Sequence, residues 1–333
     1  MRPTLRAIGL TAATATALVS ASLTVLPAHA ATAAQSATQA AAAAQPATRT
    51  VTVHLDGKTF HVQLHKPSGV VWMHGHHAKR GSTGSTADSN YTVYPPTTST
   101  GGLQYGGGPL ETSPTVYLDF WGSQWDSDAN GVQSYMQNLF GGLGASGDTW
   151  STVTSQYTDG NGASPTFNGA VLGGSWTDDG SAAPAAPSQA DIAAEADNAA
   201  AHFGVSGPNV DIYVMSPSGS QPDGFPNAGF CAWHNWDGNV AYTNMPYVLD
   251  AGSSCGANSV QNQLDGFSIV GGHEYAEAAT DPEPSSGYVD SNGEEIGDLC
   301  AWDNDQTVSL ATGTFAMQPL YSNKDNGCVF SSQ

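Results

Sequence analysis

The residues of this chain best suited to chemistry lie in the pentapeptide His273-Glu274-Tyr275-Ala276-Glu277. The chain has seven glutamates, and five of them fall between residues 274 and 295. On a helix, residues i and i+4 lie one turn apart on the same face, so His273 and Glu277 could bind one cation. Glu274 takes the place of the general base in the H-E-x-x-H pattern of metalloproteases. The spacing therefore predicts a divalent metal site on a helix.

A third protein ligand must come from outside this helix, because a catalytic zinc site normally has three protein ligands and one position for water. The downstream candidates are Asp281, Asp290, Glu294, Glu295 and Asp298, and the upstream candidate is His234. Asp281 lies two turns beyond His273, about 12 Å along an unbroken helix, which is too far to share the ion. We therefore rank Glu295 first and Asp298 second, and the alternative role for Asp298 is to orient His273 from outside the ligand set.

The residues around the motif resemble those of a known family. The stretch from Asp265 to Pro282 reads D-G-F-S-I-V-G-G-H-E-Y-A-E-A-A-T-D-P, and the stretch from Glu295 to Cys300 reads E-I-G-D-L-C. With Phe230-Cys-Ala-Trp-His234 and Tyr242, they resemble the phosphate-induced, exordium-like proteins of plant cell walls and their secreted bacterial relatives. The resemblance extends loosely over residues 112–333 and implies one site made of His234, His273, Glu274, Glu277, Glu295 and Asp298. It implies no reaction, because the plant proteins are linked with growth and the cell wall.

Three functions fit these residues. In the first, the chain is a zinc-dependent peptide hydrolase: His273, Glu277 and Glu295 hold the ion, Glu274 transfers the proton, and His234 or Tyr242 faces the oxyanion. The carboxylate of Glu277 also makes the site acceptable to Ca²⁺ or Mn²⁺. In the second, it is a non-catalytic cell-wall or signalling protein in which an ion or a polar network fixes the fold. In the third, it binds carbohydrate, because the chain has eight Trp and twelve Tyr, with Trp121, Trp125 and Trp236 as the residues to test.

The N-terminus predicts export. Arg2 and Arg6 precede an apolar stretch over residues 7–26, and Ala28-His29-Ala30 fits a cleavage site, so residues 1–30 are expected to be a secretory signal peptide. The four cysteines of an exported chain predict two disulfides, with three possible connectivities. We favour Cys231 with Cys255 and Cys300 with Cys328.

Charge is distributed very unevenly along the chain. Seven of the eight Lys and Arg residues precede residue 81, and from there on 28 acidic residues face Lys324 alone. Such an anionic surface argues against nucleic acids and anionic membranes as partners. The expected partner is a peptide or protein substrate, or a component of the cell wall.

The expected organisation is a single catalytic domain behind an N-terminal extension. Residues 31–110 read as a low-complexity linker and possible pro-segment, with a β-hairpin at residues 51–64 and a dibasic pair, Lys79-Arg80, as a cleavage point. Residues 111–333 are expected to form an α+β domain of zincin-like architecture, a twisted mixed sheet packed on helices with the metal-bearing helix at the cleft. We predict strands at 114–121, 210–215 and 239–244, helices at 132–143, 148–157, 188–203 and 265–280, and a hairpin at 288–299.

Overall fold

The structure is a computed structural model that describes residues 48–75, 85–88, 91–98 and 100–332. The described residues belong to one compact unit. The expected signal peptide and the Lys79-Arg80 pair lie outside the described residues, so both remain predictions. In the described part of the chain, no helix is long and apolar enough to span a bilayer.

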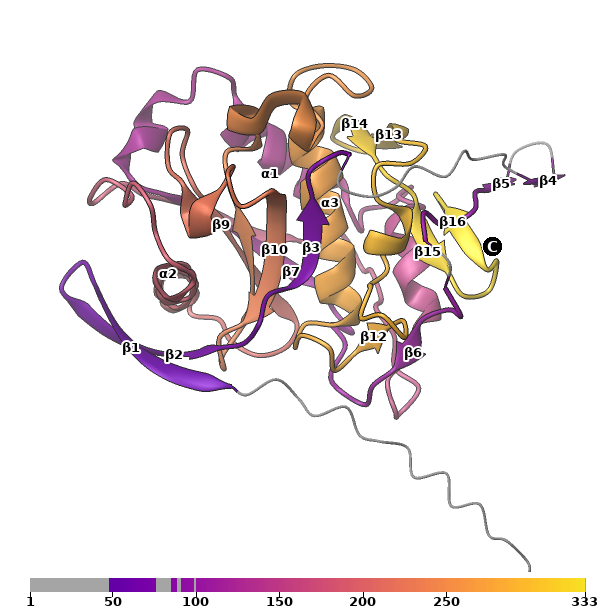
Figure 1. The fold of residues 1–333 in the computed structure, drawn as a ribbon, viewed down its shortest axis with the longest axis horizontal. Helices are drawn as coiled ribbons and strands as arrows, with labels where there is room; N and C mark the ends of the chain where they lie inside the picture. Colours follow the sequence, from indigo (N-terminus) through magenta and orange to yellow (C-terminus); the bar gives the residue numbers. More distant parts are fainter. Residues whose placement is uncertain (1–47, 76–84, 89–90, 99, 333) are drawn as a thin grey trace, which may run out of the picture. The chain divides into compact units, whose positions relative to one another are not determined.

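A six-stranded mixed sheet forms the centre of the unit, in the order β3-β10-β11-β9-β7-β8 (Figure 1). Four of its strands run parallel: β7 (Thr115–Trp121), β8 (Leu172–Asp178), β9 (Val210–Met215) and β11 (Ala241–Met245). β10 (Phe230–Trp236) is antiparallel to β11, and β3 (Ser68–Trp72) is antiparallel to β10. Every residue of β9 is buried, as expected for a parallel strand covered on both faces. The predictions of strands at 114–121, 210–215 and 239–244 are thus confirmed.

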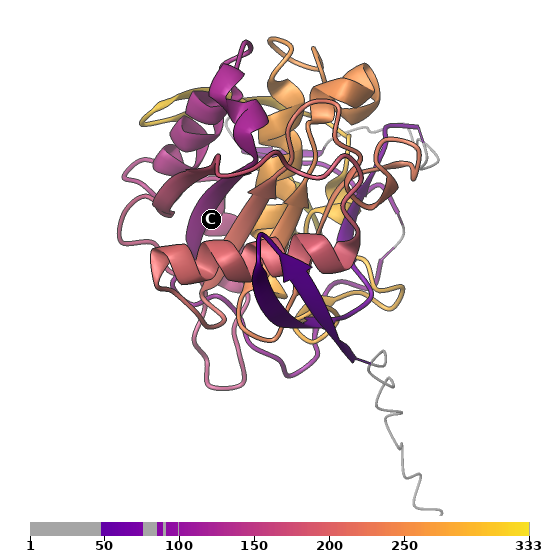
Figure 2. The same ribbon diagram turned by 90° about the vertical axis from the view of Figure 1, so that its left-hand side faces the viewer.

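Helices cover both faces of this sheet. α1 (Val132–Gly142) and α3 (Asp265–Thr280) lie on one face, and α2 (Gln189–Phe203) lies on the other (Figures 1 and 2). α2 begins with the capping box of Ser188 and Asp191 and ends at Gly204, whose φ of 69° suits glycine. The three corresponding helix predictions are confirmed, and the molecule is an α+β protein.

α3 is buried along its whole length, which two glycines make possible. The carbonyl of Gly271 accepts a hydrogen bond of 2.6 Å from the hydroxyl of Tyr213 in β9. A Cβ on Gly272 would lie 2.4 Å from the Cε of Met317 in β14, so glycine leaves room for this side chain against the helix. A helix covered on every side can carry polar side chains only where other polar groups meet them.

The remaining elements are small and form the periphery. The two-stranded pairs are β1 (Arg49–Leu55) with β2 (Lys58–Leu64), β4 (Ser85–Asp88) with β5 (Tyr91–Val93), β6 (Gln104–Tyr105) with β12 (Tyr288–Val289), β13 (Gln306–Leu310) with β14 (Gly313–Met317), and β15 (Leu320–Ser322) with β16 (Gly327–Val329). The 3₁₀ helices are η1 (Ser123–Ser127), η2 (Ser151–Gln156), η3 (Pro222–Gly224), η4 (Val248–Cys255) and η5 (Asp298–Cys300). Disulfides join Cys231 to Cys255 and Cys300 to Cys328, which confirms the favoured pairing.

Three features differ from the sequence-based expectation. The helix expected at 148–157 is the 3₁₀ helix η2. The hairpin expected at 288–299 does not form, because β12 pairs with β6. The carboxylate of Asp290 accepts the N–H groups of Asn292 and Glu294 in a tight loop, after which the chain turns into η5. The compact unit also begins well before residue 111, because the hairpin β1–β2 packs on α2 and β3 joins the central sheet (Figure 2).

Candidate metal centre

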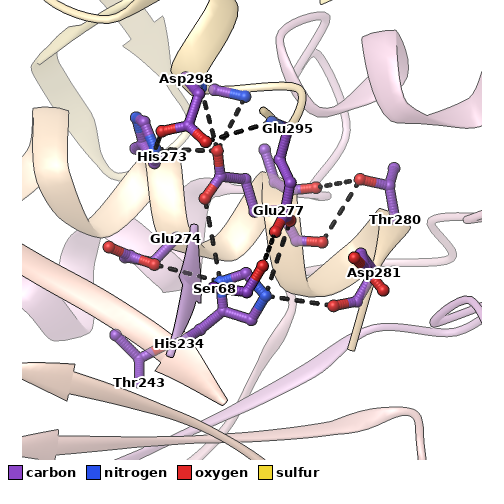
Figure 3. A network of polar contacts seen from close by, with 12 residues as sticks. Ser68, His234, Thr243, His273, Glu274, Glu277, Thr280, Asp281, Glu295 and Asp298 are labelled. Carbon is purple, nitrogen blue, oxygen red and sulfur yellow. Dashed lines mark hydrogen bonds and ion pairs between the residues drawn. The ribbon is translucent and has the colours of Figure 1, made fainter. Parts of the chain in front are cut away.

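Three elements supply the polar side chains of the candidate site. α3 contributes His273, Glu274 and Glu277, β10 contributes His234, and the chain entering η5 contributes Glu295 and Asp298 (Figure 3). The first five of these side chains are fully buried, and the side chain of Asp298 is 11% exposed. The fold therefore brings together all the site residues that the resemblance implies, in the interior of the protein.

His273 is held in one tautomer by Gln318. The amide nitrogen of Gln318 donates 2.8 Å to the carbonyl of Gly297, so its oxygen Oε1 faces Nδ1 of His273 at 3.0 Å. Since this oxygen can only accept, Nδ1 carries a ring proton, and Nε2 is the nitrogen whose lone pair can bind an ion. Nε2 lies 2.9 Å from Oε1 of Glu277 and 3.5 Å from Oδ1 of Asp298. A ring lone pair that faces two carboxylates is the arrangement of a metal ligand oriented from behind.

Gly297 brings the main chain against this group. Oε1 of Glu277 accepts the backbone N–H of Gly297 at 3.1 Å and that of Asp298 at 3.0 Å. A Cβ on Gly297 would lie 2.8 Å from Nδ1 of His273 and 2.9 Å from Oε1 of Glu277, so any side chain here would displace the site. Gly297 stands inside the E-I-G-D-L-C stretch, which could have singled it out, whereas Gln318 carries no sequence signal that we can name.

His234 repeats the same arrangement from the strand side. Its Nε2 lies 3.1 Å from the main-chain carbonyl of Asp281, which can only accept, so Nδ1 is the nitrogen with the lone pair. Nδ1 lies 3.3 Å from Oε2 of Glu274 and 3.8 Å from Oε2 of Glu277, while Nε2 lies 3.7 Å from Oε2 of Glu295. Both histidines thus donate outward to a carbonyl oxygen and face carboxylates with the other nitrogen.

Two groups of three residues have ligand atoms close enough to hold an ion. One is His273, Glu277 and Asp298, and the other is His234, Glu277 and Glu295; within each, the ligand atoms lie within 4.8 Å of one another. Asp298, which we ranked second, is therefore the residue that joins His273, whereas Glu295 joins His234. Glu277 belongs to both groups.

The residues fit a bound cation because several of their atoms have no hydrogen-bond partner. These buried atoms are Nε2 of His273, Oε1 of Glu274, Oε2 of Glu277 and Oε2 of Glu295. The 2.9 Å contact of His273 with Glu277 does not have the geometry of a hydrogen bond. Buried polar atoms without partners destabilise a protein, and a cation would satisfy them together.

The electrostatics of the ion-free site point the same way. Burial, and then the charge of Glu277, holds the pKa of Glu274 well above its usual range, and burial with the charge of Asp281 does the same for Glu295. Burial, with the charge of Asp298, raises the pKa of Glu277 to about 7. Within the described residues, only His234 and His273 pair with these carboxylates. Without lysine or arginine partners, the carboxyl groups either keep protons or bind a cation.

Protonation of the two histidines is affected in opposite directions. Burial lowers the pKa of His234 to about 4, so this ring is neutral. Burial also lowers the pKa of His273, but the negative charges of Glu277 and Asp298 outweigh it and hold that pKa well above its usual value. In the absence of an ion, His273 therefore holds a second proton, on Nε2, and a bound metal would replace this proton.

Several predicted candidates lie outside these two groups. Tyr242 follows the alternation of β11: its neighbour Thr243 pairs with His234, so Tyr242 points to the opposite face, where it pairs with Asn235 and packs on Trp233. Tyr242 therefore does not face the metal groups. The carboxylate of Asp281 accepts the N–H groups of Ser285, Ser286 and Gly287 and is not a ligand. Asp290 and Glu294 belong to neither group.

Comparisons of the chain with protein-family models, with curated proteins and with solved structures found no match. The functional interpretation therefore rests on the geometry of the site.

Proposed function

We propose that the protein is an exported, metal-dependent peptide hydrolase of zincin-like architecture, and that His273, Glu277 and Asp298 hold its ion. The observation that carries this proposal is the fixed tautomer of His273. Its Nδ1 faces an acceptor oxygen of Gln318, so Nε2 is the nitrogen left to bind an ion, and it lies 2.9 Å from Glu277 and 3.5 Å from Asp298. One imidazole and two carboxylates suit Zn²⁺ and leave Mn²⁺ and Ca²⁺ acceptable.

The roles of the chain's own residues follow from their positions. An ion bound to this group would supply Lewis-acid chemistry. Glu274 is adjacent to His273 and has one oxygen without a partner, so it is placed to take a proton from water. The hydroxyl of that water adds to the carbonyl carbon of the peptide, the carbon–nitrogen bond breaks, and Glu274 returns the proton to the leaving amine. Nδ1 of His234 lies 3.3 Å from Oε2 of Glu274 and can accept a hydrogen bond from this carboxyl group while it carries the proton.

The rival function is a non-catalytic extracellular protein in which an ion, or the polar network alone, fixes the fold. The observation that favours it is the complete burial of His273, Glu274 and Glu277. Carbohydrate binding through the tryptophans is less well supported, because Trp121 and Trp125 are 1% and 3% exposed and belong to the core. Trp121 is the last residue of β7, which lies between β9 and β8, and Trp125 belongs to the following 3₁₀ helix η1.

Substituting Glu274→Gln separates the two functions. We expect the purified chain to contain zinc by elemental analysis and to cleave a peptide library until a chelator is added. Glu274→Gln should keep the metal and lose about 100-fold to 10,000-fold in turnover, the usual contribution of a general base. Glu195→Gln is the matched control, because Glu195 is a buried glutamate of α2 on the other face of the sheet. Unchanged turnover in Glu274→Gln would overturn the mechanism. Metal without any turnover, both in the unmodified chain and in a variant whose strand β3 is displaced from the site, would establish the rival.

A further inference from the structure

The strand β3 closes the candidate site. A Cβ placed on Gly69 would lie 2.1 Å from Oε2 of Glu277 and 2.4 Å from Nδ1 of His234, so the main chain of β3 lies directly on both groups. The preceding residue, Ser68, donates a short hydrogen bond from its hydroxyl to Oε1 of Glu295. Figure 3 shows Ser68 between His234 and Glu295, and Figure 1 shows β3 alongside α3. A substrate could not reach Glu277 while this strand is in place.

β3 occupies the position that an extended peptide would take on this sheet. It pairs antiparallel with β10 through Trp72 opposite Phe230, Val71 opposite Ala232 and Ser68 opposite His234. β3 is the outermost strand, so without it β10 would be an edge with unpaired N–H and C=O groups. Such an edge binds extended peptides by adding them as a further strand. Because β10 also carries His234, a peptide added there would pass directly over the site.

The backbone of β3 departs from a regular strand at the site itself. The register with β10 shifts between Val71 and Ser68, so the strand carries an extra residue there. Gly69 has φ +53°, in the left-handed region, rather than the extended conformation of a paired strand. The main chain of β3 at Gly69 thus fills the site in a conformation that differs from that of an extended peptide substrate.

β3 comes from a different part of the chain from the rest of the site. The residues of the two metal groups, together with Glu274, Gly297 and Gln318, lie between positions 234 and 318, whereas Ser68 and Gly69 belong to the N-terminal segment that holds seven of the eight basic residues. No disulfide fixes this segment, because the four cysteines lie at 231 and beyond. Its attachment at the far end of β3 includes a hydrogen bond of 2.6 Å from Nε1 of Trp302 to the carbonyl of Trp72.

We propose that β3 is a built-in inhibitory strand, which occupies the place along β10 where the substrate, an extended polypeptide, binds antiparallel. Release of residues 68–72 opens the site, and the substrate then replaces them. This inference rests on the proposed hydrolase function, of which it names both the substrate class and the regulation.

The test compares two glycine substitutions in the full chain. Gly69→Val puts a side chain against Glu277 and His234, so it forces β3 off the site. Gly57→Val is the matched control: Gly57 also has a positive φ, +76°, in the same N-terminal segment, but a Cβ there meets nothing within 4 Å. Both variants are checked for folding by circular dichroism and by the absence of free thiols. The probe is a fluorescent synthetic peptide with the sequence of residues 66–75, K-P-S-G-V-V-W-M-H-G, whose binding is measured without reference to turnover.

We expect Gly69→Val to bind this peptide. It should cleave a peptide library at least about tenfold faster than the unmodified chain, which corresponds to a decrease of about 1.4 kcal/mol in the activation barrier. The unlabelled peptide should inhibit this cleavage. Gly57→Val should behave like the unmodified chain. Peptide binding without cleavage would support the inhibitory strand and overturn the hydrolase function. A folded Gly69→Val that neither binds the peptide nor gains activity would overturn the inhibitory strand, and it would leave the hydrolase function intact if the unmodified chain is already active.

A second variant covers the case in which Gly69→Val does not fold. Trp302→Phe removes the hydrogen bond to the carbonyl of Trp72 and keeps an aromatic ring, at a position outside the metal groups. It should bind the peptide more weakly than an open site but measurably better than the unmodified chain. Equal peptide binding by Trp302→Phe and the unmodified chain, together with an unfolded Gly69→Val, would count against the proposal, because β3 would then be an integral strand.

Discussion

Two clusters of buried carboxylates lie on opposite faces of the central sheet, and they are stabilised in different ways. On the face of α3, the carboxylates of Glu274, Glu277 and Glu295 meet histidine nitrogens. On the face of α2, Glu195 lies with Asp119 and Asp178 (Figure 2 shows α2 across this face). Glu195 and Asp119 are as fully buried as the acids on the α3 face, and Asp178 is half-buried, so burial alone does not distinguish a candidate metal centre from an acidic network.

The α2 cluster is stabilised by an amide and a lysine. Nδ2 of Asn198 lies 3.0 Å from Asp178 and 3.3 Å from Glu195, while its oxygen accepts a hydrogen bond of 2.5 Å from Nζ of Lys58. Burial, and then the charge of Asp119, raises the pKa of Glu195 to about 11, so this carboxyl keeps its proton at neutral pH. These acids form no group of three metal-ligating atoms among the described residues. The comparison teaches that a fixed histidine lone pair, rather than a concentration of buried acids, marks the candidate metal centre.

The largest expected effect follows from removing that lone pair. His273→Ala should abolish zinc binding, measured by elemental analysis after gel filtration, and should leave no measurable turnover. Asn198→Ala, which removes a polar side chain from the α2 cluster, should leave the zinc content unchanged. Full zinc content in His273→Ala would contradict the proposal that a histidine on the α3 face binds the ion.

A chelator should lower the free energy of unfolding by removing the ion from the α3 face, and the α2 cluster should not contribute to this decrease. An ion present at 1,000 times its dissociation constant stabilises the folded state by about 4 kcal/mol, which a chelator removes. The free energy of unfolding, measured in urea with and without chelator, should fall by this amount in the unmodified chain and in Glu195→Gln. Equal stability with and without chelator would mean that the polar network folds without an ion.

Removing the group behind His273 should have a smaller effect. Gln318→Leu takes away the oxygen that faces Nδ1, so the ring is free to adopt the other tautomer, and zinc affinity should fall by about 10-fold to 100-fold. Gln156→Leu is a suitable control, since Gln156 bonds to Ser322, remote from the metal groups. Unchanged zinc affinity in competition with a coloured chelator would show that Gln318 does not orient His273.

The elements that could be predicted are those whose sequence signal lies within the element itself. Ser188 and Gly204 mark the ends of α2 in the sequence, and the buried run of β9 is continuous, so both elements were predictable. β3 was not, because five residues that include a glycine carry no strand signal, and its partner β10 is about 160 positions away.

The same reasoning explains the ligand assignment. His273 and Glu277 share one helix face, so their proximity follows from helix periodicity. The choice between Glu295 and Asp298 depends on how the chain enters η5, where the N–H groups of Gly297 and Asp298 bind Glu277. Tyr242 was a candidate because zinc peptidases use a Tyr or His against the oxyanion, and strand alternation puts it on the other face.

The smallest expected effect is the part of the pH dependence of stability that the α2 face contributes. The folded-state pKa of Glu195 is about 11, against 4.5 for a free glutamate, so the folded protein keeps a proton that the unfolded chain loses. The free energy of unfolding should therefore decrease as pH rises from about 5 toward 11. Glu195→Gln should flatten this decrease by at least about 1 kcal/mol between pH 5 and pH 9. Urea unfolding in chelator measures it without a metal contribution, and the exposed Asp126→Asn is the control; identical slopes would mean that Glu195 is ionised in the folded protein.

The disulfide between Cys300 and Cys328 has a consequence for where this protein can be assembled. It ties the last residue of η5 to β16, two positions after Asp298, so the carboxylate that completes the His273 group is held by a bond that forms only under oxidising conditions. Inside a cell with reduced thiols, the loop with Asp298 lacks this tether. On the proposed function, a newly made chain would therefore complete its set of ligands only after export, away from the proteins of the cell that makes it.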